Sequence, residues 1–149
     1  MRIIADNRKA RHDYQVLDQL EAGIVLTGTE VKSCRARNLS LNDSYAKAED
    51  GELWLVNAHI APYEQGNRNN HEPRRPRKLL LQKRELRRLT QAVEAKGLTL
   101  VPLKVYFNER SLVKVELGLC RGRQQHDKRD DLKRQDDDRE MLRAVRTQR

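Results

Sequence analysis

The residue types that carry out catalysis are present in this chain but are scattered along it. The four histidines fall in four separate segments, at His12, His59, His71 and His126. No two of them have the i and i+4 spacing of a helical zinc site. The chain also lacks the glycine-rich loop that holds phosphates and the Gly-x-Ser-x-Gly turn that presents a serine nucleophile. We therefore expect neither an enzyme nor a metal or other cofactor.

The two thiols could also do chemistry, since a Cys–His pair can assemble in a folded protein. With two cysteines and four histidines, chance proximity explains a Cys–His pair better than a catalytic role does. Cys34 and Cys120 lie in segments with the pattern of ordinary packed structure. They fit a reducing cytosol rather than a disulfide framework, with one bridge as the open alternative. We expect a cytoplasmic protein, because there is no signal-peptide pattern and no apolar run of membrane-spanning length.

The carboxylates gather near the end of the chain, in a pattern that could suggest a two-metal nuclease. These residues are Asp127, Asp130, Asp131, Asp136, Asp137 and Asp138. A two-metal site needs a rigid frame that holds the ions about 4 Å apart, and this segment lacks one. An RNA-processing enzyme is therefore the weakest of the functions considered.

The charge of the chain favours a nucleic-acid partner. The net charge is +9, from 31 Lys and Arg against 22 Asp and Glu. Residues 1–120 and residues 121–149 are both basic, and no amphipathic segment pairs this charge with a broad apolar face for a membrane. With one Phe, one Trp and four Tyr, base stacking on an aromatic platform has poor support. We expect recognition by shape and phosphate contact.

The segment 121–149 holds ten Lys and Arg and seven Asp and Glu but few apolar side chains. It cannot offset the entropy of ordering itself, so we expect it to be disordered when free. Lys128, Arg139, Arg143 and Arg146 recur close to whole helical turns, so a helix here would carry one basic stripe. This pattern predicts a tail that folds against a polyanion, with a solvated charged tail as the alternative.

The body offers two candidate binding segments. A basic run from Asn7 to His12 suits phosphate groups but has little specificity by itself. Glu30 lies among cations that include Lys32 and Arg35. A carboxylate in a basic surface repels phosphate, so one interpretation is that Glu30 accepts hydrogen bonds from a base. The alternative, which the spacing favours, is a helix-start glutamate that pairs with a Lys or Arg.

The elements that position these residues are mostly strands. A strand is predicted over 14–28, with Gly23 at a bulge or bend, followed by a short helix that Thr29 caps and that runs through Arg35. A hairpin is predicted from strands 44–49 and 52–57, joined at Asp50-Gly51. Next we expect a mobile loop over 64–78, in which Arg75 would make a peripheral phosphate contact. A helix is predicted over 82–96, stopped by Gly97. A second hairpin joins 98–107 to 112–119.

Several short strands with one clear helix favour a mainly β fold, a small, partly open oligonucleotide-binding (OB)-type barrel with one or more helices packed on it. We expect residues 1–120 to form this RNA-binding barrel and residues 121–149 to form the tail. A monomer is the default.

Several motifs resemble the small protein B (SmpB) family of bacterial SsrA-binding proteins. They are Asn7–Tyr14, Glu21–Ser33, Arg77–Leu81, and the run His126–Arg129 followed by Lys133, Arg139, Glu140 and Arg143. The likeness runs from Asn7 to Arg146, and four motifs in the same order make the resemblance specific.

The resemblance implies an OB-type barrel that binds the tRNA-like domain of transfer-messenger RNA (tmRNA). Such a protein delivers tmRNA to stalled ribosomes for trans-translation, in which ribosomes are rescued and nascent peptides are tagged. Implied partners are tmRNA, the small-subunit decoding centre and message channel of the ribosome, and elongation factor Tu bound to alanyl-tmRNA. The main alternative is a structural ribosomal protein of OB type whose tail binds rRNA.

The resemblance also assigns residues to these partners. The implied tmRNA-binding surface comprises Asn7, Lys9, Glu30, Lys32, Arg35 and Lys78. The implied ribosome-binding tail begins with the hinge and decoding-centre motif Gly122, His126, Asp127, Lys128 and Arg129. It continues as a helix in the message channel, with Lys133, Arg139 and Arg143.

Some positions depart from the family pattern. Arg37 stands where the family usually has Gly, which argues against a positive-φ turn there. Gln124 and Gln135 replace usual basic residues, and Asp136–Asp138 is unusually acidic for a segment that lies along ribosomal RNA.

Overall fold

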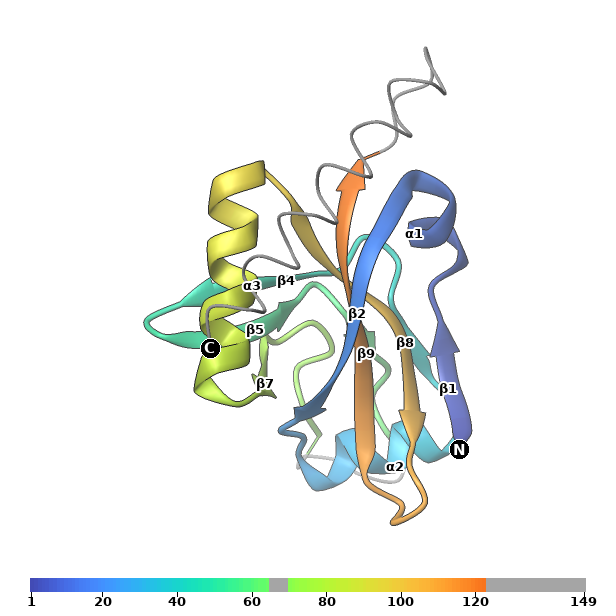
Figure 1. Cartoon of the computed structure of the whole chain (residues 1–149). Helices are drawn as coiled ribbons and strands as arrows, with labels where there is room; N and C mark the ends of the chain where they lie inside the picture. The colour runs from blue at the N-terminus through green and yellow to red at the C-terminus, as the bar shows by residue number, and fades with distance from the viewer. Residues whose placement is uncertain (65–69, 123–149) are drawn as a thin grey trace.

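The structure, a computed structural model, describes residues 1–64 and 70–122 and forms a β-barrel with helices packed around it (Figure 1). The strands of the main sheet are β1 (Arg2–Asp6), β2 (Tyr14–Ile24), β4 (Tyr45–Glu49), β5 (Glu52–Val56), β7 (Arg77–Leu80), β8 (Thr99–Phe107) and β9 (Val113–Gly122). A separate pair joins β3 (Leu39–Ser40) to β6 (His59–Ile60). The helices are α1 (Arg8–Asp13), α2 (Gly28–Arg35) and α3 (Lys83–Lys96).

The main sheet closes on itself because β8 pairs along both of its edges. The strand order is β1-β8-β4-β5-β7-β2-β9, and β9 also pairs with β8. One edge of β8 is shared, with Asp6 of β1 opposite Lys104 and Ala46 of β4 opposite Leu100. Every pairing is antiparallel. The expected mainly β, OB-type barrel with packed helices is confirmed.

The barrel core follows from the alternation of side chains along its strands. In β9, Val115, Leu117 and Leu119 are fully buried, as the period of two predicted. Helices α2 and α3 contribute to the same core through Cys34 of α2 and Leu89 of α3. Among the described residues, no helix is long and apolar enough to cross a membrane.

Three local predictions are confirmed. The β4–β5 hairpin turns at Asp50 and Gly51, which both have positive φ, of 53° and 75°. Helix α3 begins after Gln82 and ends at Gly97, which has a left-handed conformation. The hairpin of β8 and β9 is also present. Its connection, residues 108–112, is capped by the Asn108 side chain, which accepts from the backbone N–H groups of Arg110 and Leu112.

Two details of the local predictions were wrong. Of the two roles predicted for Gly23, a bulge or a bend, the bulge is absent, because the register of β2 against β9 shifts between Val16 and Asp18 instead. Up to Ala22, β2 pairs with β9 alone. Gly23 pairs with strands on both sides, with Leu80 of β7 and Lys114 of β9. Thr29 is not the cap of α2, because Thr27 holds that position.

Arg37 has a φ of 60°, so the positive-φ turn is present although the residue is not glycine. The backbone N–H of Arg37 donates to the carbonyl of Cys34, and that of Asn38 donates to the carbonyl of Ser33, both at 2.9 Å. These two hydrogen bonds are the Schellman arrangement that ends many helices. The two hydrogen bonds hold the left-handed residue in place, so the expectation drawn from its side chain was wrong.

Strand β9 extends through Gly122, which lies opposite Tyr14 of β2. The sheet therefore includes the first two residues of the segment assigned to the tail. The remaining tail positions lie outside the described residues, including His126, Asp127, Lys128, Arg129, Lys133, Arg139 and Arg143 and the departures at Gln124, Gln135 and Asp136–Asp138.

Candidate RNA interface

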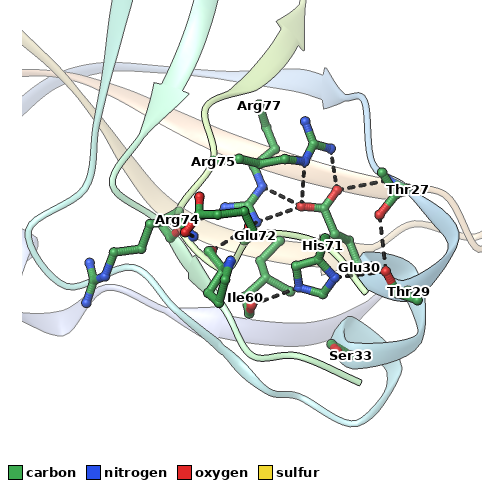
Figure 2. A network of polar contacts seen from close by, with 12 residues as sticks. Thr27, Thr29, Glu30, Ser33, Ile60, His71, Glu72, Arg74, Arg75 and Arg77 are labelled. Carbon is green, nitrogen blue, oxygen red and sulfur yellow. Dashed lines mark hydrogen bonds and ion pairs between the residues drawn. The ribbon is translucent and has the colours of Figure 1, made fainter. Parts of the chain in front are cut away.

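Glu30 lies at the centre of a network that joins α2 to the start of β7 and to the segment before it (Figure 2). Its carboxylate accepts hydrogen bonds from Arg75 Nε at 3.1 Å and from Arg77 Nε at 2.7 Å. Arg75 Nη2 binds the other carboxylate oxygen, so Arg75 holds Glu30 with two bonds. The backbone N–H of Thr27 donates to the same oxygen at 2.8 Å, which forms half of a capping box at the start of α2.

This environment keeps Glu30 ionised. Burial raises the pKa of the carboxyl group, but the hydrogen bonds from Arg75, from the Thr27 backbone and from Arg77 outweigh burial and lower the pKa below its ordinary value. Burial also lowers the pKa of Arg77, and the hydrogen bond to Glu30 opposes that shift. An arginine side chain loses its proton only far above neutral pH, so Arg77 stays charged at neutral pH. The pair is therefore a buried salt bridge.

The structure corrects the direct-contact interpretation of Glu30. The side chain is fully buried and its two oxygens already accept bonds from Arg75, Arg77 and the Thr27 backbone, which leaves no accessible acceptor for a base. The pairing alternative is the one found, with partners 45 and 47 residues away in the sequence rather than along the helix. Glu30 thus positions its neighbours and does not form part of the outer surface.

Arg75, for which the sequence predicted a peripheral phosphate contact, is held against Glu30 and remains partly exposed, so the phosphate contact stays a prediction. The segment around it is held at further points, as Arg77 donates to the carbonyls of Ala58 at 2.7 Å and Pro73 at 3.0 Å. His71 bridges the same segment to α2. Its Nε2 donates to the carbonyl of Ile60 at 2.9 Å, and in the neutral ring its Nδ1 accepts from the Thr29 hydroxyl at 2.9 Å (Figure 2).

The remaining predicted residues of α2 are exposed. Lys32 lies over the ring of Tyr63, with 5.5 Å from Nζ to the ring centroid. Arg35 is exposed one turn later and forms no hydrogen bond or ion pair with the part of the chain that the structure describes. On β7, Lys78 points outward and pairs with Glu52 at 2.8 Å. Because Lys78 follows Arg77, the Glu30–Arg77 pair brings Lys78 and α2 to one region.

Asn7 and Lys9 belong to a different region. Figure 1 shows α1 and α2 near opposite ends of the strands. The Asn7 side chain is buried and caps α1, accepting from the N–H of Ala10 at 3.1 Å and donating to the carbonyl of Pro102 at 2.8 Å. Lys9 is exposed and pairs with Asp43 at 3.1 Å, and this hydrogen bond raises the pKa of Lys9. Of these two side chains, only that of Lys9 is exposed and can contact a ligand.

Sequence reasoning missed Arg77 as the buried partner of Glu30. The signal was the alternation in the Arg77–Leu81 motif. Since Leu79 points into the barrel, Arg77 two residues earlier points the same way. The sequence prediction assigned Arg77 to a mobile loop, so the alternation of a strand was not applied to it.

The thiols have the character of core residues. Cys34 and Cys120 are free and buried, and burial raises the pKa of each to about 12. Both therefore stay protonated at neutral pH and are poor nucleophiles. Within residues 1–64 and 70–122, no group of three or more His, Cys, Asp or Glu side chains is placed to hold a metal ion.

Comparison with known proteins identifies the family. A family model described as SmpB protein matches residues 4–147. An SsrA-binding protein of Moorella thermoacetica is 58% identical over 146 residues, covering 98% of this chain and 94% of its own, and one of Chelativorans sp. is 57% identical over 143 residues, covering 96% and 92%.

A solved structure gives the same result for the fold. Its chain, described under "tmRNA-SmpB: a journey to the center of the bacterial ribosome", is 60% identical with a TM-score of 0.69. The match covers 83% of this chain and 87% of that chain. The sequence likeness, the barrel and the solved relative agree, and the chain belongs to the SmpB protein family.

Proposed function

We propose that this chain binds the tRNA-like domain of tmRNA and delivers it to stalled ribosomes for trans-translation. The observation that carries the proposal is the family match over residues 4–147, together with a relative solved in a tmRNA–SmpB complex. The role is one of binding rather than catalysis, and it places the protein in the cytoplasm with the ribosome. Alanyl-tmRNA in complex with elongation factor Tu is the third partner.

The α2 region is the part of the described structure best suited to RNA. The exposed cations Lys32 and Arg35 lie on one helix, and Lys78 lies on the adjoining strand. Such cations bind phosphates, which fix the orientation of an RNA. Glu30, Arg75 and Arg77 set the position of α2 relative to β7 and therefore the spacing of these cations. Lys9 provides a further contact near α1.

The tail supplies the ribosomal part of the proposal. Gly122, assigned as the hinge, lies in β9 opposite Tyr14 of β2, directly before the rest of the segment assigned to the tail. We propose that His126, Asp127, Lys128 and Arg129 engage the decoding centre and that Lys133, Arg139 and Arg143 lie in the message channel. Truncation after Gly122 should then leave tmRNA affinity nearly intact and abolish tagging on stalled ribosomes.

The decisive test is a titration of the whole chain against labelled tRNA-like domain at about 150 mM salt, with a hairpin of equal length as competitor. We expect tight binding that the hairpin does not displace. Weak binding that either RNA displaces equally would overturn the proposal and favour a structural ribosomal protein.

A further inference from the structure

The outward surface of β4, β5 and β7 is a sheet face with an unusual combination of side chains. We call this surface the Trp54 face and define it by Tyr45, Lys47, Trp54, Lys78 and Leu80, together with Val25, which follows β2 and donates its backbone N–H to the carbonyl of Lys78 at 3.0 Å. Its orientation follows from the strands, because Leu53, Leu55 and Leu79 point into the core and the residues between or beside them therefore point out. The chain has one tryptophan, and it lies here on the outside, partly exposed.

The strand register places Trp54 between two lysines. Lys47 of β4 is directly opposite Trp54, and Lys78 of β7 is directly opposite on the other side. Neighbouring strands are about 4.8 Å apart, so both ammonium groups are within reach of anything that lies on the indole. Their present partners are surface carboxylates, Glu49 at 3.4 Å from Lys47 and Glu52 at 2.8 Å from Lys78. Exposed pairs of this kind are weak, and a phosphate can replace the carboxylate.

The same face carries exposed apolar side chains. Tyr45 is 41% exposed, Val25 47% and Leu80 49%, which makes three of the six large hydrophobic residues exposed in the described part of the chain. Gly23 lies beside Leu80, and a Cβ there would be 3.3 Å from the Leu80 Cβ. Tyr45 and Leu80 lie on either side of the row formed by Trp54 and the two lysines opposite it, so exposed apolar side chains flank this row. Exposed apolar residues that share one face favour an interaction surface.

We propose that the Trp54 face is a stacking platform for an unpaired base of the bound RNA, with Lys47 and Lys78 contacting the phosphates beside that base. The identity of the RNA rests on the proposed function, whereas the stacking contact is an addition to it. An apolar face between two lysines, in a chain of net charge +9, complements a nucleotide, which has a flat π surface and an anionic backbone. The low aromatic content argued against a platform of several rings, but one ring at the right place suffices for one base.

The single tryptophan makes a direct test possible, because fluorescence excited selectively at tryptophan, and not at the four tyrosines, reports on Trp54 alone. The wild-type protein is titrated with the tRNA-like domain of tmRNA and, separately, with a short single-stranded RNA. Stacking predicts that tryptophan fluorescence is quenched in step with binding. The single-stranded probe should also quench, more weakly, because stacking requires only an unpaired base.

Three substitutions separate stacking from packing. Trp54→Leu keeps apolar bulk and Trp54→Ala removes it, and each should weaken binding to the tRNA-like domain by roughly 5- to 150-fold, as expected for the loss of one base–aromatic stack. Trp54→Phe keeps an aromatic ring and should stay close to wild type. Leu112→Ala, on an exposed apolar residue of the β8–β9 turn away from this face, is the matched control and should have no effect. Circular dichroism and thermal melts check that each variant is folded.

Unchanged fluorescence on binding, or Trp54→Leu with wild-type affinity, would overturn the stacking contact while leaving the proposed function in place. Conversely, failure of the wild type to bind the tRNA-like domain, together with quenching by single-stranded RNA, would reject the proposed function and keep the platform. If the variants unfold, the wild-type quenching experiment still decides the question. Binding of a protein rather than RNA at this face would appear as wild-type RNA affinity in all three Trp54 variants, which also overturns the proposal.

Discussion

Glu30 of α2 and Arg77 of β7 are 47 residues apart in sequence and form an ion pair in which both side chains are 0% exposed, with 2.6 Å between Arg77 Nη2 and Glu30 Oε2. The pair ties the helix that carries Lys32 and Arg35 to the strand that carries Lys78. Arg75, at the edge of the same pair, is partly exposed and binds the same carboxylate. Two arginines around one carboxylate give the group a net positive charge, and Arg75 is its partly exposed member.

Removal of Glu30 should destabilise the fold. Glu30→Ala leaves Arg77 buried without its anion, and breaking a buried pair in this way costs about 3–5 kcal/mol. Arg75→Ala removes a partner that is 31% exposed, and water can replace it, so its effect should be clearly smaller. Urea denaturation followed by circular dichroism measures both. Equal stability of Glu30→Ala and wild type would show that the network does not hold α2 in place.

The same pair should give a characteristic dependence of stability on pH. Because the folded-state pKa of Glu30 lies below the ordinary value of 4.5, the unfolded chain binds a proton more readily than the folded chain at acidic pH. The contribution of Glu30 is therefore fully present above about pH 5 and is lost as the pH falls through the folded-state pKa.

This expectation is tested by comparing wild type with Glu30→Gln. The difference in unfolding free energy between the two proteins should be constant near neutral pH and should shrink as the solution is acidified. Arg77 stays charged over this range, so it does not add a second transition. A difference that is constant or that grows at low pH would mean that Glu30 is not the ionised partner.

The sequence was sufficient for the elements whose signals are local. The Asp50-Gly51 turn, the stop at Gly97 and the alternation in β9 each depend on neighbouring residues, and each was predicted correctly. The barrel class followed from the number of such strands. What the local pattern could not supply was closure, because the sharing of one β8 edge between β1 and β4 depends on contacts far apart in the chain.

The candidate site shows the same limit. Charge and family resemblance indicated Lys32, Arg35 and Lys78, and the structure leaves all three on the surface. Charge and resemblance could not distinguish these three exposed residues from Asn7 and Glu30, which are buried and whose polar groups bind other parts of the protein. The burial of Glu30 depends on Arg77, which becomes an inward-facing residue only once β7 is paired with β2 and β5.

Arg37 provides a prediction about helix termination. A non-glycine residue at a φ of 60° has a steric cost between its Cβ and the backbone, and glycine avoids this cost. Arg37→Gly should therefore stabilise the protein by up to about 1 kcal/mol, the glycine benefit being reduced by its greater freedom in the unfolded chain. Lys32→Gly is a control with the opposite expected sign. It places glycine inside α2, where it should lower the free energy of unfolding by about 1 kcal/mol. Thermal melts measure both, and a lower melting temperature for Arg37→Gly would contradict the strain argument.

Gly118 is required by close packing inside the barrel. A Cβ at this position would be 2.8 Å from Leu103 Cδ1 and 3.0 Å from Cys120 Sγ, and all three residues are buried. Gly118→Ala should cost about 1–3 kcal/mol through overpacking. Leu103→Ala makes a cavity at the same place, so adding Gly118→Ala to it should cost much less than adding it to the wild type. Strict additivity of the two changes in urea denaturation would rule out this contact as the cause.

The exposed cations of α2 should contribute to RNA binding through phosphate contacts. Arg35→Ala and Lys32→Ala should each weaken binding to the tRNA-like domain and reduce the slope of log K against log salt by about one. Arg110→Ala is the matched control, because Arg110 is also an exposed arginine and lies in the β8–β9 turn. Filter binding at several salt concentrations gives the slopes. An unchanged slope for both α2 variants, or the same change for Arg110→Ala, would place the RNA elsewhere. A change confined to α2 would tie the buried Glu30 network to binding, since the network sets where these two cations lie relative to Lys78.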